Sequence, residues 1–110
     1  MGMINLPTTI NICGKIYTCI RDRSITGAEF EFNSRTIIIG DCADHAVLDY
    51  LVHEISEVIH IILGTRIEHA GNNGYVFLMN HNNFQTHNEI LVETLLSNNI
   101  ITFNCITDEA

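Results

Sequence analysis

The stretch His53-Glu54-Ile55-Ser56-Glu57-Val58-Ile59-His60 carries four ionisable side chains in a segment whose apolar residues recur at helical spacing. An α-helix turns about 100° per residue, so side chains three or four positions apart share a face. His53 and Glu57 are four apart and His60 is three further on, whereas Glu54 lies about a quarter-turn round the axis. The stretch therefore predicts a helix with an imidazole and a carboxylate side by side.

This helix is expected over about residues 43–63. Asp41 or Asp44 is expected to cap its start, and Gly64 to end it. The expected core stripe consists of Leu48, Val52, Ile55, Ile59 and Ile62. The opposite side is expected to hold Asp49, His53, Ser56, Glu57 and His60.

Two hairpins are expected before the helix. Residues 9–20 are rich in β-branched types and can turn at Gly14-Lys15. Residues 28–39 alternate Phe with Glu and can turn at Asn33-Ser34. The run Ile37-Ile38-Ile39 is typical of a strand covered on both faces.

A third hairpin, over residues 65–80, and a second helix are expected after the first helix. Thr86 and Glu89 match a capping box, so the second helix is expected over about 86–98. Its expected inner side consists of Ile90, Leu91, Thr94 and Leu95. The segment Ile100–Ile106 is expected to form a last strand or extended tail. This order predicts one α+β domain over residues 3–106, a small mostly antiparallel sheet packed on two helices.

Charge and cysteine usage exclude several classes of function. With a net charge of −8 and only five Lys and Arg, the chain repels phosphate backbones, so no nucleic-acid partner is expected. The apolar run around residues 55–63 is too short and too charged to span a membrane. The four cysteines lack C-x-x-C spacing, and no signal peptide is evident, so reduced thiols in a cytoplasmic protein are expected.

Three short motifs carry a resemblance to a known group of proteins. They are Gly14-Lys15-Ile16-Tyr17, the His53–Glu57 sequence HEISE, and the segment from His87 through Glu93 to Leu95. In this order the chain resembles small phage and prophage proteins with a minimal zincin-like metallopeptidase fold. HEISE follows the HExxE variant of the zincin motif HExxH, with Glu57 in the second ligand position.

The resemblance implies a zinc site and a hydrolytic reaction. His53, Glu57 and His87 would bind Zn²⁺, and Glu54 would activate a water for attack on a peptide or protein substrate. The implied setting is the cytoplasm of an infected or lysogenic host cell.

Other residues compete for the third ligand position. Glu93 on the second helix is a reserve ligand, and His81 is another if the hairpin folds back. His60 shares the face of His53 but lies about 10 Å further along the helix axis, so it is not expected to bind the same ion. Tyr75 is a candidate for lining a substrate groove.

An alternative function is a non-catalytic metal-binding or metal-free interaction module that docks on a host or phage protein. Glu57 in place of a second imidazole favours this alternative, because a carboxylate donates more charge and reduces the Lewis acidity of the metal.

Overall fold

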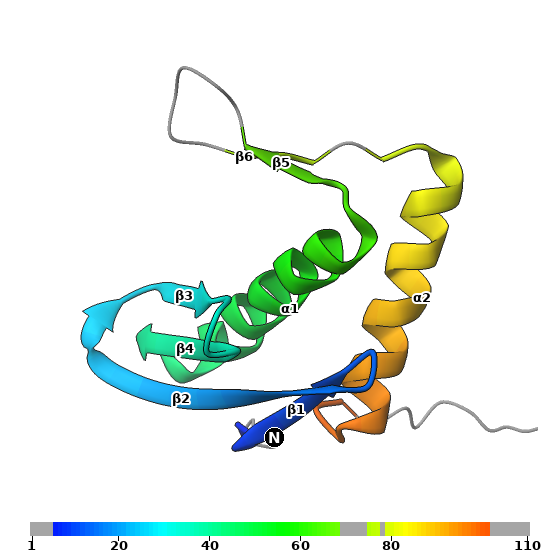
Figure 1. Ribbon diagram of the computed structural model, residues 1–110. Helices are drawn as coiled ribbons and strands as arrows, with labels where there is room; N and C mark the ends of the chain where they lie inside the picture. Colours follow the sequence, from blue (N-terminus) through cyan, green and yellow to red (C-terminus); the bar gives the residue numbers. More distant parts are fainter. Residues whose placement is uncertain (1–5, 69–74, 78, 102–110) are drawn as a thin grey trace, which may run out of the picture.

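The computed structural model describes residues 6–68, 75–77 and 79–101. The elements in this part of the chain, labelled in Figure 1 where there is room, are β1 (Thr9–Ile12), β2 (Lys15–Thr26), β3 (Ala28–Glu31), β4 (Thr36–Asp41), the 3₁₀ turn η1 (Asp44–Ala46), α1 (Val47–Leu63), β5 (Arg66–Glu68), β6 (Tyr75–Phe77) and α2 (His81–Ser97). The α+β class predicted from the sequence is confirmed.

The main sheet is mixed and has the strand order β1-β2-β4-β3. β1 pairs antiparallel with β2, and β3 pairs antiparallel with β4. β2 and β4 pair in parallel, with Thr18 opposite Thr36 and Arg21 opposite Ile39. The two predicted hairpins are thus present, as β1 with β2 and β3 with β4. The second hairpin joins the first through the pairing of β4 with β2. The sheet is mostly antiparallel, as expected, but its central pairing is parallel.

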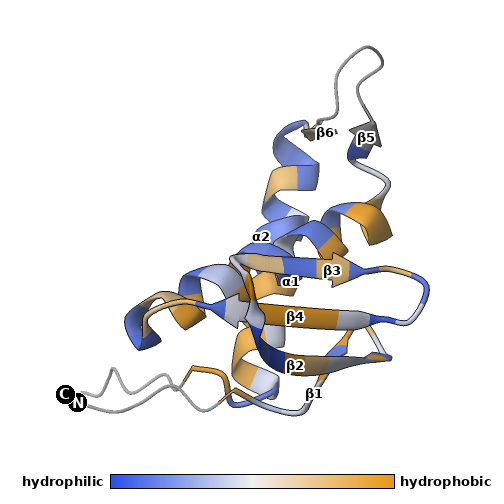
Figure 2. Cartoon of the chain, turned by 90° about the vertical axis from the view of Figure 1, so that its left-hand side faces the viewer, coloured by the Kyte–Doolittle hydropathy of each residue, from blue (hydrophilic) through white to orange (hydrophobic). Residues whose placement is uncertain are grey.

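Strand β4 lies inside the sheet, between β2 and β3 (Figure 2). Ile37 and Ile39 are fully buried, whereas Ile38 between them is only half-buried. The prediction that both faces of this strand are covered is therefore wrong: α1 and α2 lie on one side of the sheet (Figure 1).

Gly40 lies where β4 passes closest to the corner between β2 and β3. Its amide donates a hydrogen bond to the carbonyl of Gly27 at 2.6 Å. A Cβ at position 40 would lie 2.6 Å from the carbonyl oxygen of Ile25 and 2.7 Å from that of Gly27. Both atoms belong to the backbone, so a side chain here forces the strands apart.

Gly40→Ala is expected to destabilise the protein by about 1–3 kcal/mol, the usual cost of overpacking. Thermal unfolding followed by circular dichroism measures the change. Thr26→Ala, an exposed position at the same corner, serves as the control and is expected to have a smaller effect. An unchanged melting temperature for Gly40→Ala would mean that the corner opens easily.

Helix α1 ends as the sequence predicts but begins differently. Gly64 adopts a left-handed conformation (φ 74°), and its amide donates to the carbonyl groups of His60 and Ile61. The N-cap is Ala46, without a side-chain hydrogen bond, so the prediction of an Asp41 or Asp44 cap is wrong. The chain enters α1 through the 3₁₀ turn η1 instead.

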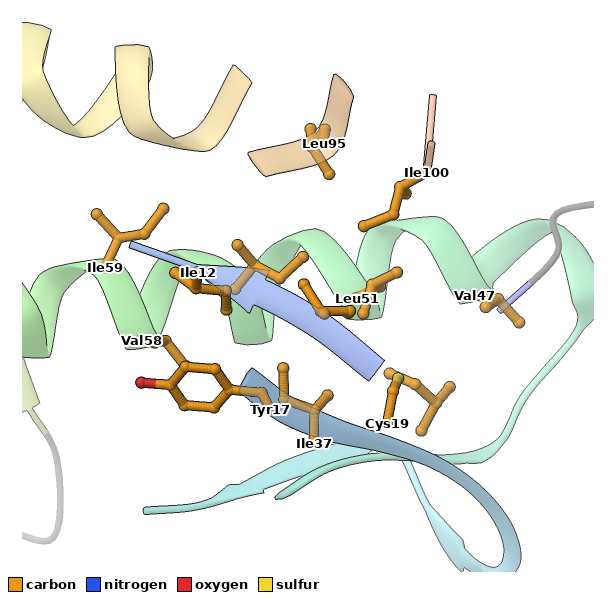
Figure 3. Packing of buried hydrophobic residues seen from close by; sticks show 13 residues of the cluster. Ile12, Tyr17, Cys19, Ile37, Val47, Leu51, Val58, Ile59, Leu95 and Ile100 are labelled. Carbon is orange, nitrogen blue, oxygen red and sulfur yellow. The ribbon is translucent and has the colours of Figure 1, made fainter. Parts of the chain in front are cut away.

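The buried face of α1 is turned relative to the predicted stripe. Ile55 and Ile59 are buried as expected, but Ile62 is 41% exposed and Leu48 and Val52 are only partly buried. The buried side chains of this helix are Val47, Leu51, Glu54, Ile55, Val58, Ile59 and His60. Its apolar members pack with Ile12, Tyr17, Cys19 and Ile37 of the sheet and with Leu95 and Ile100 (Figure 3).

Helix α2 begins five residues earlier than predicted. Asn80 is the N-cap, and its side-chain oxygen accepts a hydrogen bond from the amide of Asn83 at 2.8 Å. Residues 81–83, expected in a loop, form the first turn, and Thr86 lies inside the helix. The inner side is as predicted, with Thr94 and Leu95 buried and Ile90 and Leu91 partly buried.

The end of α2 is attached to the edge strand β1. The Asn98 side chain accepts a hydrogen bond from the amide of Asn11 and donates one to its carbonyl, both at 2.9 Å. Ile100, just beyond, is buried in the core. Residues 102–106 of the predicted last strand lie outside the described residues.

The hairpin of β5 and β6 is present and antiparallel, as predicted. Residues 69–74 of this segment, including the expected turn, lie outside the described residues. In the described part of the chain, neither helix has the length and apolar character needed to cross a bilayer.

Candidate metal centre

One face of α1 brings His53, Glu54 and Glu57 together. Each offers a ligand atom, and these atoms all lie within 4.8 Å of one another. The Nε2 atom of His53 lies 2.7 Å from the Oε2 atom of Glu57. The imidazole and the carboxylate expected to share a helix face are therefore in direct contact. An imidazole nitrogen and carboxylate oxygens are donors that suit Zn²⁺.

The three side chains form a gradient from solvent into the protein. The His53 side chain is 63% exposed, that of Glu57 is 22% exposed, and Glu54 is buried. An ion arriving from solvent would meet His53 first and the carboxylates behind it. The group is thus accessible to solvent on the side of His53.

Burial is the main cause of a raised pKa of the Glu54 carboxyl, and the neighbouring Glu57 carboxylate raises that pKa further. His53 and Arg66 act in the opposite direction, and Glu29 adds to the increase. Two carboxylates and an imidazole so close together favour a bound cation, which removes the repulsion between the carboxylates.

Arg66, the first residue of β5, approaches the site from the hairpin. Its Nη2 atom lies 3.7 Å from the Oε1 atom of Glu57. Glu57 is thus contacted on one oxygen by His53 and on the other by a guanidinium. This arrangement holds the carboxylate in place, and a metal ion would compete with His53 for the Oε2 atom.

His87 lies beside His60 and not within the His53 group. The centroids of the two imidazole rings are 4.5 Å apart. His87 is 7% exposed, and its Nε2 atom is buried without a hydrogen-bond partner. Among residues 6–68, 75–77 and 79–101, the only group of three or more potential ligands consists of His53, Glu54 and Glu57. The structure brings two of the three expected ligands together and leaves the third next to His60.

His60 is buried and contacts Thr65 at the end of α1. The Thr65 hydroxyl lies 2.7 Å from Nδ1 of His60 and 3.3 Å from the carbonyl oxygen of the same residue. Burial and the neighbouring His87 lower the pKa of His60, opposed by Glu57. Glu57 therefore acts electrostatically on His60, three residues further along α1.

The other candidates for the third ligand lie on the outside of α2. His81 and Glu93 are exposed and line a groove of about 860 Å³ that contains none of the three clustered residues. His60, expected on the polar side of α1, is buried. The side chain of Tyr75 lies outside the described part of the structure.

A hollow of about 440 Å³ adjoins the cluster, and sequence reasoning missed it. His53 and Glu54 line it together with Asp49 and Tyr50 of α1 and residues 26–28 of the sheet. Asp49 is four residues before His53, a helical spacing visible in the sequence. Residues 26–28, which close the hollow, are far from α1 in the sequence, and no pattern in the sequence predicted that they lie beside it.

No protein-family model, curated protein or solved structure matches this chain. The resemblance to small zincin-like phage proteins therefore stays a prediction.

Proposed function

We propose that this chain binds Zn²⁺ through His53 and Glu57 and hydrolyses a bond in a peptide or protein substrate. The observation that carries the proposal is the convergence of His53, Glu54 and Glu57 within 4.8 Å beside a hollow of about 440 Å³. Paired donors on consecutive helix turns, with a third acidic group next to them, suit metal-assisted hydrolysis.

Glu54 is assigned as the general base. When bound, a zinc ion lowers the pKa of a coordinated water to about 7. Glu54 takes a proton from the attacking water and passes it to the leaving amine. Its buried position supports this role, because it keeps the carboxylate out of bulk water and beside the hollow that would receive the substrate.

His87 is kept as the proposed third ligand. Its Nε2 atom is buried without a partner, and a buried polar atom left in this state costs free energy. Coordination of a cation would satisfy the atom. Its ring lies 4.5 Å from that of His60, which is three residues after Glu57 on α1, and this position supports a link between His87 and the cluster.

Zinc binding is the first test. The wild-type protein is expected to take up one Zn²⁺ per chain in a competition titration with a chromophoric chelator. His53→Ala is expected to weaken binding by at least about 100-fold, since it removes a ligand and not only an outer contact. His45→Ala, on the exposed turn η1, is the matched control and is expected to bind like wild type. If His53→Ala and wild type bind Zn²⁺ with equal affinity, the metal does not bind at His53 on α1.

A non-catalytic metal-binding module that docks on another protein is the second candidate function. It is favoured by the position of His87, because the cluster without His87 holds only three donors and one of these is the proposed base. A large fall in melting temperature on chelation, without detectable proteolysis, would support this alternative.

The cytoplasm of a host cell is the proposed setting. Cys13, Cys19 and Cys42 are free thiols, which agrees with a reducing compartment. Burial raises the pKa of the Cys19 thiol to about 11, so this cysteine is a packing residue and not a nucleophile.

A further inference from the structure

Positive charge is scarce in this chain, with five Lys and Arg against thirteen Asp and Glu. Three of the five have partners within the protein. Arg21 donates to the carbonyl groups of Gly40 and Cys42, Arg23 pairs with Asp41, and Arg66 lies near Glu57. These three cations are accounted for by the fold and by the candidate metal centre.

The other two, Lys15 and Arg35, form no ion pair with any described residue, and both line the same pocket. Lys15 follows the tight turn between β1 and β2, and Arg35 precedes β4. In a protein with eight excess negative charges, two cations at one place with no acidic partner in the described part of the chain are not explained by the fold.

The pocket has a volume of about 330 Å³, and its walls are largely apolar. Apart from the two cations and Asn33, the lining side chains are Tyr17, Phe32, Ile61 and Ile62. Phe32 is 56% exposed and Ile62 is 41% exposed, which is a cost for large apolar side chains in water. Covering them would recover part of that cost.

Hydrogen bonds fix the backbone of Arg35 at the edge of the pocket. Arg35 has a left-handed conformation (φ 51°), its amide donates to the carbonyl of Phe32 at 3.2 Å, and its carbonyl accepts from Thr18 at 2.8 Å. Arg35 also acts electrostatically on the phenol of Tyr17, where it opposes the increase in pKa caused by burial. Arg35 and Tyr17 both line the pocket, which agrees with this electrostatic effect.

We propose that this pocket binds an organic carboxylate with an apolar or aromatic body. Arg35 would bind the carboxylate in a two-pronged contact and Lys15 would add a point charge, while Phe32 and Ile62 would cover the apolar part. The volume is at the small end for ligand sites, so it suits one aromatic ring or branched alkyl group with its carboxylate. The pocket shares no lining residue with the metal cluster, and the inference is independent of the proposed hydrolysis.

The same chemistry can come from a free aromatic acid or from a peptide in which Phe precedes acidic residues. The net charge of the whole protein repels both at long range, so attraction depends on the two local cations and falls as salt is raised.

The test uses 3-phenylpropionate and the peptide acetyl-Phe-Asp-Glu-amide as probes. Their binding to the full chain is monitored through the NMR chemical shifts of the backbone amides. Saturable shifts are expected around residues 15–17, 32–35 and 61–62 with at least one probe. The uncharged 3-phenylpropionamide is expected to bind at least about tenfold more weakly, because it cannot pair with Arg35. If the peptide binds more tightly than the free acid, the natural ligand is a peptide segment. If the free acid binds more tightly, the natural ligand is a small molecule.

Two variants separate binding from folding. Arg35→Gln and Lys15→Gln are each expected to weaken probe binding by at least about fivefold, with unchanged circular dichroism spectra. Arg23→Gln removes an exposed cation paired with Asp41 and is expected to bind like wild type. The proposal is overturned if neither probe saturates, if the amide binds as well as the acid, if inorganic phosphate competes as well as 3-phenylpropionate, or if both pocket variants bind like wild type.

Discussion

Glu54→Gln is expected to retain the zinc ion and to lower peptide hydrolysis by about 10²–10⁴-fold, the range for loss of a general base. The substitution keeps the size of the side chain but removes its ability to accept a proton. Glu54 is 5% exposed, so the size of its replacement matters, and Gln fits the same space without a new cavity. The measurement is the release of new amino groups from a peptide library by zinc-loaded protein, with the metal content determined on the same samples.

Glu29→Gln is the matched control for this experiment. Glu29 is an exposed carboxylate on β3 that influences Glu54 electrostatically but is not one of the three clustered residues. Its replacement is expected to change the rate by less than threefold. If Glu54→Gln cleaves as fast as wild type, another group supplies the base and the assignment is wrong.

Ile55→Ala is expected to destabilise the protein by about 2–5 kcal/mol, through lost burial and the cavity left behind. Ile55 is fully buried in the core between the sheet and the helices (Figure 3). Since domains of this size are stable by about 5–15 kcal/mol, the loss is a large fraction of the total. The melting temperature is expected to fall by roughly 10 °C or more.

The control for the core experiment is Ile62→Ala, the same substitution on the same helix. Ile62 is 41% exposed, so its truncation is expected to cost less than about 1 kcal/mol. Chemical unfolding of both variants measures the difference. Similar losses for the two variants would mean that α1 packs through a different face from the one described.

The end of α1 was predictable, but the rotation of its buried face was not. Gly64 stops the helix through a local conformation that a sequence reveals directly. The apolar residues of this helix are spread around much of its circumference, however. Their spacing alone therefore could not show whether Leu48 or Leu51 faces the core. The choice depends on where the sheet and α2 lie, which is tertiary information.

The start of α2 shows two local signals in competition. The capping box of Thr86 and Glu89 predicted a start at residue 86, but Asn is also a preferred N-cap residue. The structure uses Asn80. His87 consequently belongs to the second turn of the helix and not to its first, and it lies against His60.

The candidate site divides in the same way between local and distant contributions. The contact between His53 and Glu57 follows from a spacing of four residues on one helix, so the sequence predicts it without knowledge of the fold. The place of His87 and the hollow beside Glu54 depend on how α2 and the β2–β3 corner pack. The parallel pairing of β2 with β4 was missed for the same reason, because it joins strands that are not neighbours in sequence.

The attachment of Asn98 to β1 has a consequence for self-association. β1 lies at one edge of the sheet, and an edge strand with unsatisfied amide and carbonyl groups recruits strands from other molecules. At Asn11 the carboxamide of Asn98 already fills both positions, in the way that a neighbouring strand would. A second chain can pair with β1 at Asn11 only after displacing that side chain, so one residue just after α2 hinders strand addition at this edge, whereas β3 forms the other edge of the sheet.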